Sequence, residues 1–273
     1  MTDSTRSSII LGFAFLGILL MNGLFFMMPY EALNPYEYLS GSNLSTFQVL
    51  DIFIGGAIVP LVALATGYLI NAFRHYGMGN LAKVAAFVLA LGIVQTFFIF
   101  AFDFLPGLVL MALVALLFLK AHWAMSLLTA LLLFFFHLTA NVLVGFFASV
   151  GSPTDIIYTA LQDVQEFTSV FRSTDYFAII ALNIELFSRN VISTLYGLLF
   201  TVLPWLLVGM SLGRLDIVRF IRSNPVMHII LFIVLAGGGL AIKMLQVLTL
   251  GSYSGRLLAE NFGGPVLAMV ISC

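Results

Sequence analysis

Apolar residues in this chain form long runs, and short polar connections separate one run from the next. The runs recur from Ile9 to the C-terminus and have the length of membrane-spanning helices. Because every backbone amide in lipid needs an internal hydrogen-bond partner, each run of about 20 apolar residues predicts a helix. The pattern predicts an all-α, polytopic transmembrane helical bundle of about seven spans. They are Ser8–Met28, Phe47–Phe73, Val84–Phe102, Leu105–Leu119, Trp123–Val150, Phe187–Leu212 and Met227–Leu248.

Two apolar runs are shorter than the others. The fourth span is entered through Leu105-Pro106-Gly107, and we expect it to pair with the third span as a tight outer hairpin. The last run begins at Gly263, and its 11 residues are too few to cross a hydrocarbon core that is about 30 Å thick. We expect a re-entrant or partly buried stub there, or the start of a truncated helix at Cys273.

The composition supports a single integral membrane domain over residues 1–273. Hydrophobic residues make up 62% of the chain and charged residues 8%, against roughly 25% charged in soluble domains. The net charge of −1 gives no basic patch for nucleic acid. A single cysteine, Cys273, excludes an intrachain disulfide and a cysteine-based metal site. No nucleotide loop, zinc-type histidine pair or nucleophile elbow is present, so we expect no metal and no evident cofactor. The apolar composition makes the lipid bilayer the expected partner.

Charged residues sort by connection, which predicts the orientation. Basic residues near span ends hold a connection in the cytoplasm, so we predict a cytoplasmic N-terminus. The predicted inner connections hold Arg6, Arg74, Lys83, Lys120, Arg214, Arg219 and Arg222, with Asp3 and Asp216 as their acids. The outer ones hold Glu31, Glu37, Asp103, Asp155, Asp163, Glu166, Asp175, Glu185 and Glu260, against Arg172 and Arg256.

The longest connection, Gly151–Leu186, is predicted to be extracytoplasmic and to contain a helix. Ser152-Pro153-Thr154-Asp155 has the pattern of a helix start, with an N-cap serine, a proline and then an acid. Apolar residues recur at helical spacing from there to about residue 171. We expect an amphipathic helix that lies in the outer interface. A lid over an outer cavity is the alternative.

Polar side chains inside the predicted spans gather in the outer half of the membrane. Such groups are costly in hydrocarbon and usually face a bundle interior or a water-filled cavity. His137 and Asn141 are one turn apart, so they share a helix face. The whole set would converge on one outward-opening pocket: Asn22, Asp51, Gln95, Asp103, His137, Asn141, Arg189 and Lys243.

Simpler interpretations of the same residues stay open. Asp51, Arg189 and Lys243 lie near the predicted interface, where long side chains extend to the headgroups. His137 follows three phenylalanines in mid-span, and a neutral, hydrogen-bonded packing histidine is the alternative to a catalytic one. The outer-half distribution favours a site, because residues that only hold helices together have no reason to prefer one half.

Several motifs resemble a known family. Gly12–Asn22 (GFAFLGILLMN) resembles the opening LDxLRGFALLGILLVN of the YeiB-like (DUF418) family of bacterial inner-membrane proteins. Pro60–Gly67 is similar to the family's KFRxLFSLLFG, and Gly92–Gln95, followed by Asp103-Phe104-Leu105, is similar to GLLH…GDIL. Leu207–Leu215 resembles LLGMALGRLG. The resemblance covers most of the chain, but the final spans of a full-length relative have no counterpart, which implies a short member, a degenerate one or a fragment. Asn22 and Asp103 are retained, whereas Ser8, Leu11, Ala57 and Gln95 replace the Asp, Arg, Lys and His of the family.

The resemblance implies a location in the inner membrane and an acyltransferase-like function. The family is similar to membrane acyltransferases that pass an acyl group from a cytoplasmic donor to a sugar or lipid acceptor. An acyl-CoA-type donor and an envelope glycan or lipid acceptor are then implied. Since Gln95 stands at the family's histidine, we predict His137 as general base, oriented by Asn141 or Asp103. Substrate-binding residues would be Asn22, Gln95, Arg189 and Lys243.

Two further functions are compatible with the sequence. A small-solute or ion transporter would use the same polar residues as a relay near the membrane midplane, although no inverted repeat relates the two halves of the chain. A non-catalytic subunit would stabilise a membrane protein partner.

Overall fold

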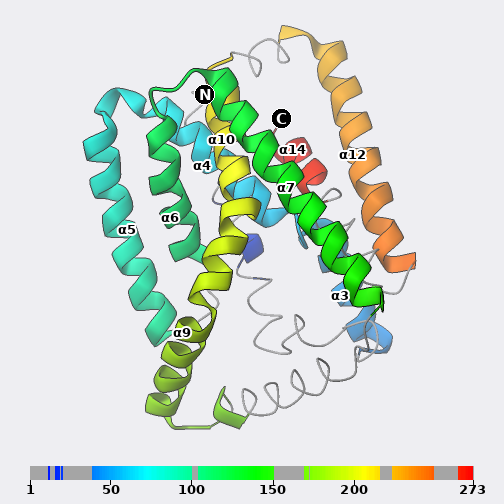
Figure 1. The fold of residues 1–273 in the computed structure, drawn as a ribbon. Helices are drawn as coiled ribbons and strands as arrows, with labels where there is room; N and C mark the ends of the chain where they lie inside the picture. Colours follow the sequence, from blue (N-terminus) through cyan, green and yellow to red (C-terminus); the bar gives the residue numbers. More distant parts are fainter. Residues whose placement is uncertain are drawn as a thin grey trace.

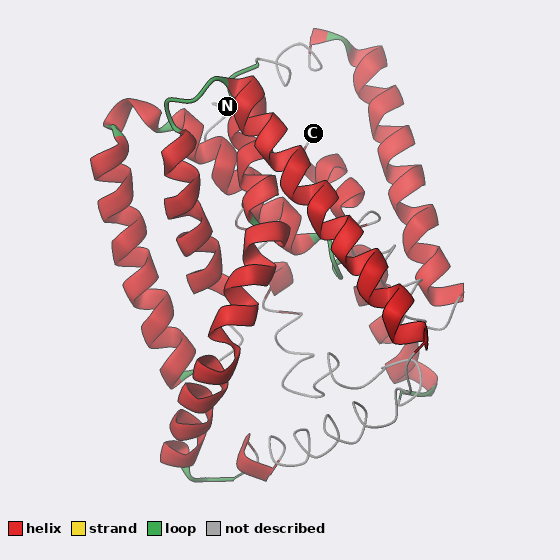
Figure 2. Cartoon of the chain, viewed as in Figure 1, coloured by secondary structure: helices red, strands yellow, loops and turns green. Residues whose placement is uncertain are grey.

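The computed structural model describes residues 12, 16–18, 20, 39–99, 104–150, 169–171, 173–215, 223–248 and 264–272. Within these ranges every regular element is a helix and no strand occurs (Figures 1 and 2). This confirms the predicted all-helical class. Five described stretches are long and apolar enough to cross a membrane: Gly41–Ala72, Met78–Phe98, Trp123–Ala140, Thr194–Leu212 and Pro225–Met244.

Most helices lie close to the predicted spans. α5 (Met78–Phe98) follows the turn η1 (Arg74–Tyr76), and α6 (Phe104–Ala115) continues into η2 (Leu116–Phe118). α7 (Trp123–Val150) has the predicted bounds, and α12 (Pro225–Leu248) matches the seventh span. α5 and α6 pack as the predicted pair: a Cβ placed on Gly92 would lie 3.1 Å from Cγ of Pro106. Most of the first predicted span lies outside the described residues.

One predicted boundary is wrong. α9 (Tyr176–Thr201) begins well before Phe187, and α10 (Leu203–Leu212) follows it. The connection expected to reach Leu186 is therefore shorter, and Arg189 lies within a helix rather than at its start. The cause is Asp175, whose carboxylate accepts hydrogen bonds from the backbone N–H groups of Phe177 and Ala178 at 3.0 and 3.2 Å. This N-cap satisfies amides that have no partner inside the helix.

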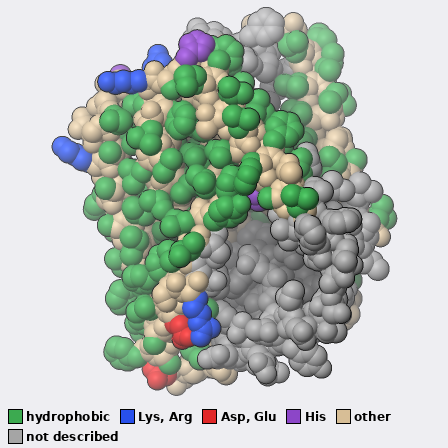
Figure 3. All heavy atoms as spheres, in the orientation of Figure 1, with side chains coloured by type: hydrophobic (Ala, Val, Ile, Leu, Met, Phe, Trp, Pro, Cys, Tyr) green, Lys and Arg blue, Asp and Glu red, His purple; other side chains and the backbone are tan. Residues whose placement is uncertain are grey.

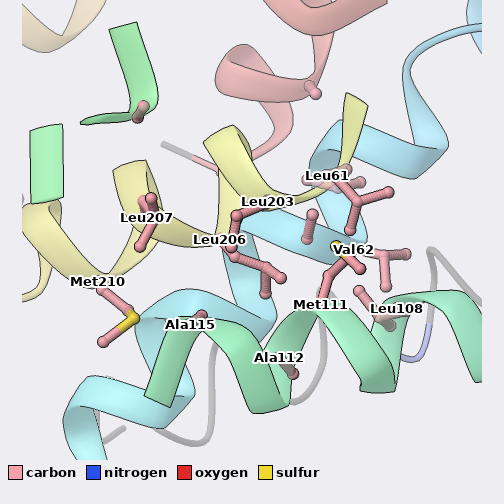
Figure 4. Close-up of a cluster of buried hydrophobic side chains, with 14 residues drawn as sticks. Leu61, Val62, Leu108, Met111, Ala112, Ala115, Leu203, Leu206, Leu207 and Met210 are labelled. Carbon is pink, nitrogen blue, oxygen red and sulfur yellow. The ribbon is translucent and has the colours of Figure 1, made fainter. Parts of the chain in front are cut away.

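The centre of the molecule is built from α4 (Ile58–Ala72), α6 and α10. Their apolar side chains interdigitate with little or no exposed surface (Figure 4). Lipid tails are as apolar as these side chains, so close packing rather than escape from water holds such helices together. The labelled core residues are Leu61, Val62, Leu108, Met111, Ala112, Ala115, Leu203, Leu206, Leu207 and Met210.

Glycines allow α4 and α10 to approach backbone to backbone. A Cβ on Gly67 of α4 would overlap the carbonyl oxygen of Leu206, and a Cβ on Gly209 of α10 would overlap that of Leu64. Any side chain at either position would push the helices apart, which explains why small residues concentrate at such crossings. Gly213 extends the contact, because a Cβ there would lie 2.7 Å from Nδ2 of Asn71.

The outer helices are mostly exposed and apolar, as lipid-facing helices are. Figure 1 shows α5 and α12 at opposite sides of the bundle, and their candidate spans are only 11% and 6% buried. α14 (Gly264–Ser272) packs against α4 and α12. Its residues Leu267 and Ala268 are buried. The last apolar run is therefore a partly buried helix, as one of the sequence-based expectations stated.

Candidate functional site

Charged side chains occupy the two ends of the long helices. Figure 3 shows Lys, Arg and His side chains along one end of the visible face and acidic side chains, with a basic one, at the other. α5 separates the two ends over about 30 Å: Arg74 and Lys83 lie at its start. At its far end, the Tyr176 hydroxyl donates to the Phe98 carbonyl at 2.5 Å, next to Asp175. Among the described residues at these helix ends, the predicted sorting of charges is therefore present.

Arg214 holds three elements together at the basic end. Its Nε donates to Oδ1 of Asn71 on α4 at 3.2 Å. Its two other nitrogens donate to the carbonyls of Phe118 and Leu119, at 2.9 and 3.0 Å, and to the carbonyl of Ala121. These carbonyls lie at and just after the end of the η2 turn, where a cation is favoured. The Phe118 carbonyl also accepts the Ala121 N–H at 3.0 Å.

The charge of Arg214 is maintained despite its surroundings. Burial is the main cause that lowers the pKa of its guanidinium, and repulsion from Arg74 lowers it further. An arginine titrates so far above neutral pH that it stays protonated in proteins. We therefore interpret the Arg214 cluster as a structural clamp between α4, α10 and the connection before α7.

A buried ion pair joins α12 to α3 (Gly41–Phe53). Nζ of Lys243 lies 3.4 Å from Oδ1 of Asp51. The Lys243 side chain is fully buried, and that of Asp51 is 11% exposed. Lys243 is thus directed into the protein rather than toward an interface, so the snorkelling interpretation does not describe it. Asp51 retains a small exposed surface, so it is the more accessible member of the pair.

The ion pair lies beside an interruption in the helix that α3 and α4 would otherwise form. The N–H groups of Ile54 and Gly55 both donate to the Leu50 carbonyl, at 2.8 and 3.1 Å. Gly56 then adopts φ 69°, a conformation that favours glycine. Among the described residues, no backbone N–H donates to the carbonyls of Ile52 and Phe53. The chain therefore has a carboxylate and under-used backbone acceptors together within a long apolar stretch.

Two glycines allow close packing at this interruption. A Cβ on Gly55 would overlap the Asp51 carboxylate, and a Cβ on Gly264 would overlap the Gly56 carbonyl. The start of α14 is thus seated on the turn between α3 and α4. Residues of α3, α12 and α14 therefore meet at this turn.

His137 lies elsewhere, at the contact of α7 with α9. Its half-buried ring is nearly parallel to that of Phe200, with centroids 6.2 Å apart and planes 6° apart. Phe136 stacks on Phe200 as well, at 5.0 Å. The histidine therefore packs on a neighbouring helix at the point where α9 approaches α10.

A polar seam that the sequence analysis missed joins α9 to the end of α5. Nδ2 of Asn183, which is fully buried, donates to the Phe97 carbonyl at 3.2 Å. Phe97 also meets Phe187 edge to face at 5.3 Å. Among the described residues, Oδ1 of Asn183 and Oγ1 of Thr96 are buried without a hydrogen-bond partner. Asn183 was overlooked because the segment before Phe187 was predicted to be a connection.

The structure places several predicted site residues on different elements. His137 contacts α9 at Phe200, 11 residues along that helix from Arg189, which corresponds to about 16 Å of helix. Arg189 is 61% exposed and pairs with Glu185 on its own helix. Gln95 is half-buried on α5, and Lys243 pairs with Asp51. Asn22, Asp103 and the side chain of Asn141 lie outside what the structure describes.

Comparison with known proteins adds no family assignment. No protein-family model, no curated protein and no solved structure matches this chain. Within the described ranges, no three His, Cys, Asp or Glu side chains lie together as metal ligands would. The function is therefore inferred from the residues, their geometry and the motifs of the sequence.

Proposed function

We propose that this chain is a multi-pass, acyltransferase-like protein of the bacterial inner membrane, with its N-terminus in the cytoplasm. Five apolar helices of sufficient length support the location. The separation of basic from acidic ends supports the orientation. The sequence motifs that resemble the YeiB-like family support the acyl-transfer chemistry.

One observation carries the catalytic assignment. Among the described side chains, His137 is the histidine that lies within a long apolar helix, whereas His75 and His122 are in exposed turns. His228 is in the first turn of α12, and its side chain lies outside what the structure describes. In the proposed reaction, His137 accepts the proton of an acceptor hydroxyl while that oxygen attacks the thioester of an acyl-CoA-type donor. An ester bond forms, the carbon–sulfur bond breaks, and the proton leaves with the thiolate. Asn141, on the same helix face, and Asp103 are the proposed orienting residues.

The test is acyl transfer in membrane vesicles that contain the protein. Labelled acyl-CoA is supplied on the cytoplasmic side, and incorporation into lipid and glycan fractions is measured. His137→Ala and His137→Gln should lose about 10²–10⁴-fold in rate, the usual contribution of a general base. His122→Ala is the matched control and should keep full activity, and Gln95→His should not reduce it. Unchanged transfer by both His137 variants would refute the assignment.

A second candidate, a transporter of small solutes or ions, is favoured by a different observation. The Asp51–Lys243 pair lies beside an interrupted apolar helix, and discontinuous helices form the substrate and ion sites of many transporters. Its test is the uptake of labelled small solutes or ions into proteoliposomes that contain the protein. An Asp51→Asn variant should lose this uptake, whereas a Glu185→Gln variant should keep it. Equal uptake by the two variants would count against transport through this pair.

A further inference from the structure

We propose that the turn between α3 and α4 forms a binding site for a monovalent cation, and that the ammonium group of Lys243 occupies this site as a tethered cation. The inference deepens the second candidate function and is independent of acyl transfer. It concerns binding rather than movement of an ion. A failed ion-binding experiment and a failed uptake experiment therefore remain distinguishable.

The oxygen atoms at the turn are those that bind hard cations. The Asp51 carboxylate already accepts a cationic group at 3.4 Å. The carbonyls of Ile52 and Phe53 end α3 and receive no backbone N–H among the described residues. A helix C-terminus carries partial negative charge, and carbonyls of interrupted membrane helices coordinate Na⁺ in transporters. Carboxylate and carbonyl oxygens at one turn of an apolar stretch therefore suit a small monovalent ion.

The contact of Lys243 with Asp51 is compatible with exchange. Its length of 3.4 Å exceeds the about 2.7–2.9 Å of a tight charge-assisted hydrogen bond. The ammonium thus neutralises the Asp51 carboxylate at a distance longer than that of the tightest hydrogen bond. An ion of the same charge in the same place would neutralise Asp51 equally well.

The helix that carries Lys243 is the least enclosed of the five candidate spans. The buried share is 6% for α12 and 50% for the stretch that contains α3 and α4. Gly237 and Gly238 of α12 have no neighbour within 4 Å of a built Cβ. Among the described elements, α12 contacts mainly α14 and α3, and sparse packing characterises segments that open at low free energy. Displacement of α12 would withdraw the ammonium and leave the oxygen atoms to an ion.

The competing explanation is an ion pair with a purely structural role. It differs from a cation site in the expected result of removing Lys243. If the pair only docks α12, no small ion takes the place of Lys243 when that side chain is removed. If the turn is a cation site, Li⁺, Na⁺ or K⁺ replaces the ammonium in a Lys243→Ala variant. The missing charge is then supplied from solution, in a saturable manner and with a preference for one ion size.

The experiment measures thermal unfolding of the full chain in detergent, at equal ionic strength in LiCl, NaCl, KCl or choline chloride. The wild type should have the same Tm in all four salts. Lys243→Ala should gain about 5–10 °C in one metal chloride over choline chloride, at an ion concentration of about 100 times Kd. The matched control is the double variant Asp51→Asn/Lys243→Ala, which should show no such preference. Equal Tm values for Lys243→Ala in all four salts, or failure of this variant to fold in any of them, would overturn the proposal.

Discussion

The ammonium of Lys243 lies 3.4 Å from the carboxylate of Asp51, although 192 positions separate the two residues. The contact joins α12 to α3 and lies next to the turn at which the long apolar stretch 41–72 is interrupted. A buried ion pair costs desolvation of both charges, and its removal as a unit is often neutral. The pair is therefore better explained by a role in docking or ion binding than by a contribution to overall stability.

The first prediction compares single and double removal of this pair. Asp51→Leu should destabilise the protein by about 3–5 kcal/mol, because it leaves the Lys243 ammonium buried without its carboxylate. Asp51→Leu/Lys243→Met should recover most of that loss. The measurement is thermal unfolding in detergent. Glu185→Gln, which removes an exposed ion pair with Arg189, should change stability by at most about 1 kcal/mol. A double variant as unstable as the single one would show that the charges themselves are required.

The second prediction concerns the crossing of α4 and α10. Gly67→Ala and Gly209→Ala should each cost about 1–3 kcal/mol, because the new Cβ would overlap a backbone carbonyl of the facing helix. Gly237→Ala and Gly238→Ala are matched controls on α12, where a Cβ meets nothing within 4 Å. Alanine is the better helix former, so the controls should keep or slightly raise the Tm. Tolerance of alanine at both Gly67 and Gly209 would contradict the close crossing.

The third prediction tests the Arg214 clamp. Lysine has no planar fork with which to reach Asn71 and the carbonyls of Phe118, Leu119 and Ala121 together. Arg214→Lys should therefore lower stability by about 1–3 kcal/mol, the cost of partly buried acceptors that lose their donors. Arg74→Lys at the same end should be nearly neutral, since Arg74 is exposed. Chemical or thermal unfolding of the two variants side by side decides between a clamp and a general effect of charge.

The sequence predicted the helices better than their contacts. Long apolar runs locate helices, because lipid leaves the backbone no other partner, and α7 has the predicted bounds. The start of α9 was missed although Asp175 is a favoured N-cap residue, because the predicted span was placed by apolar residues alone. The glycines at 55 and 56 gave a visible signal for the interruption, but the predicted span ran through them.

Pairings between distant segments could not be predicted from the pattern. Asp51 and Lys243 were each placed in the outer half of a span, yet their partnership depends on the packing of α12 beside α3. The single outward-facing pocket is likewise inferred from depth in the membrane, and depth does not specify which helices are neighbours. It stays a prediction, because Asn22, Asp103 and the side chain of Asn141 lie outside what the structure describes. His137 packs against Phe200, whereas Arg189 is exposed and paired with Glu185.

The last prediction concerns orientation. Gly79 is exposed at the start of α5, near Arg74 and Lys83, and a Cβ there meets no neighbour within 4 Å. Ser169 is exposed in the segment between α7 and α9. Basic residues near span ends favour a cytoplasmic connection, so we expect Gly79 on the inner side and Ser169 on the outer side. The two positions are therefore suited to single-cysteine variants made after Cys273→Ser removes the native thiol.

A membrane-impermeant maleimide should label Ser169→Cys in intact cells and Gly79→Cys only after the membrane is permeabilised. The Cys273→Ser parent controls for labelling of other proteins, and full labelling of both variants in detergent shows that each thiol is reactive. Labelling of both variants in intact cells, or of Gly79→Cys alone, would overturn the proposed orientation. An inverted chain would also place the Asp51–Lys243 end toward the cytoplasm, so this result determines from which side an ion would reach the pair.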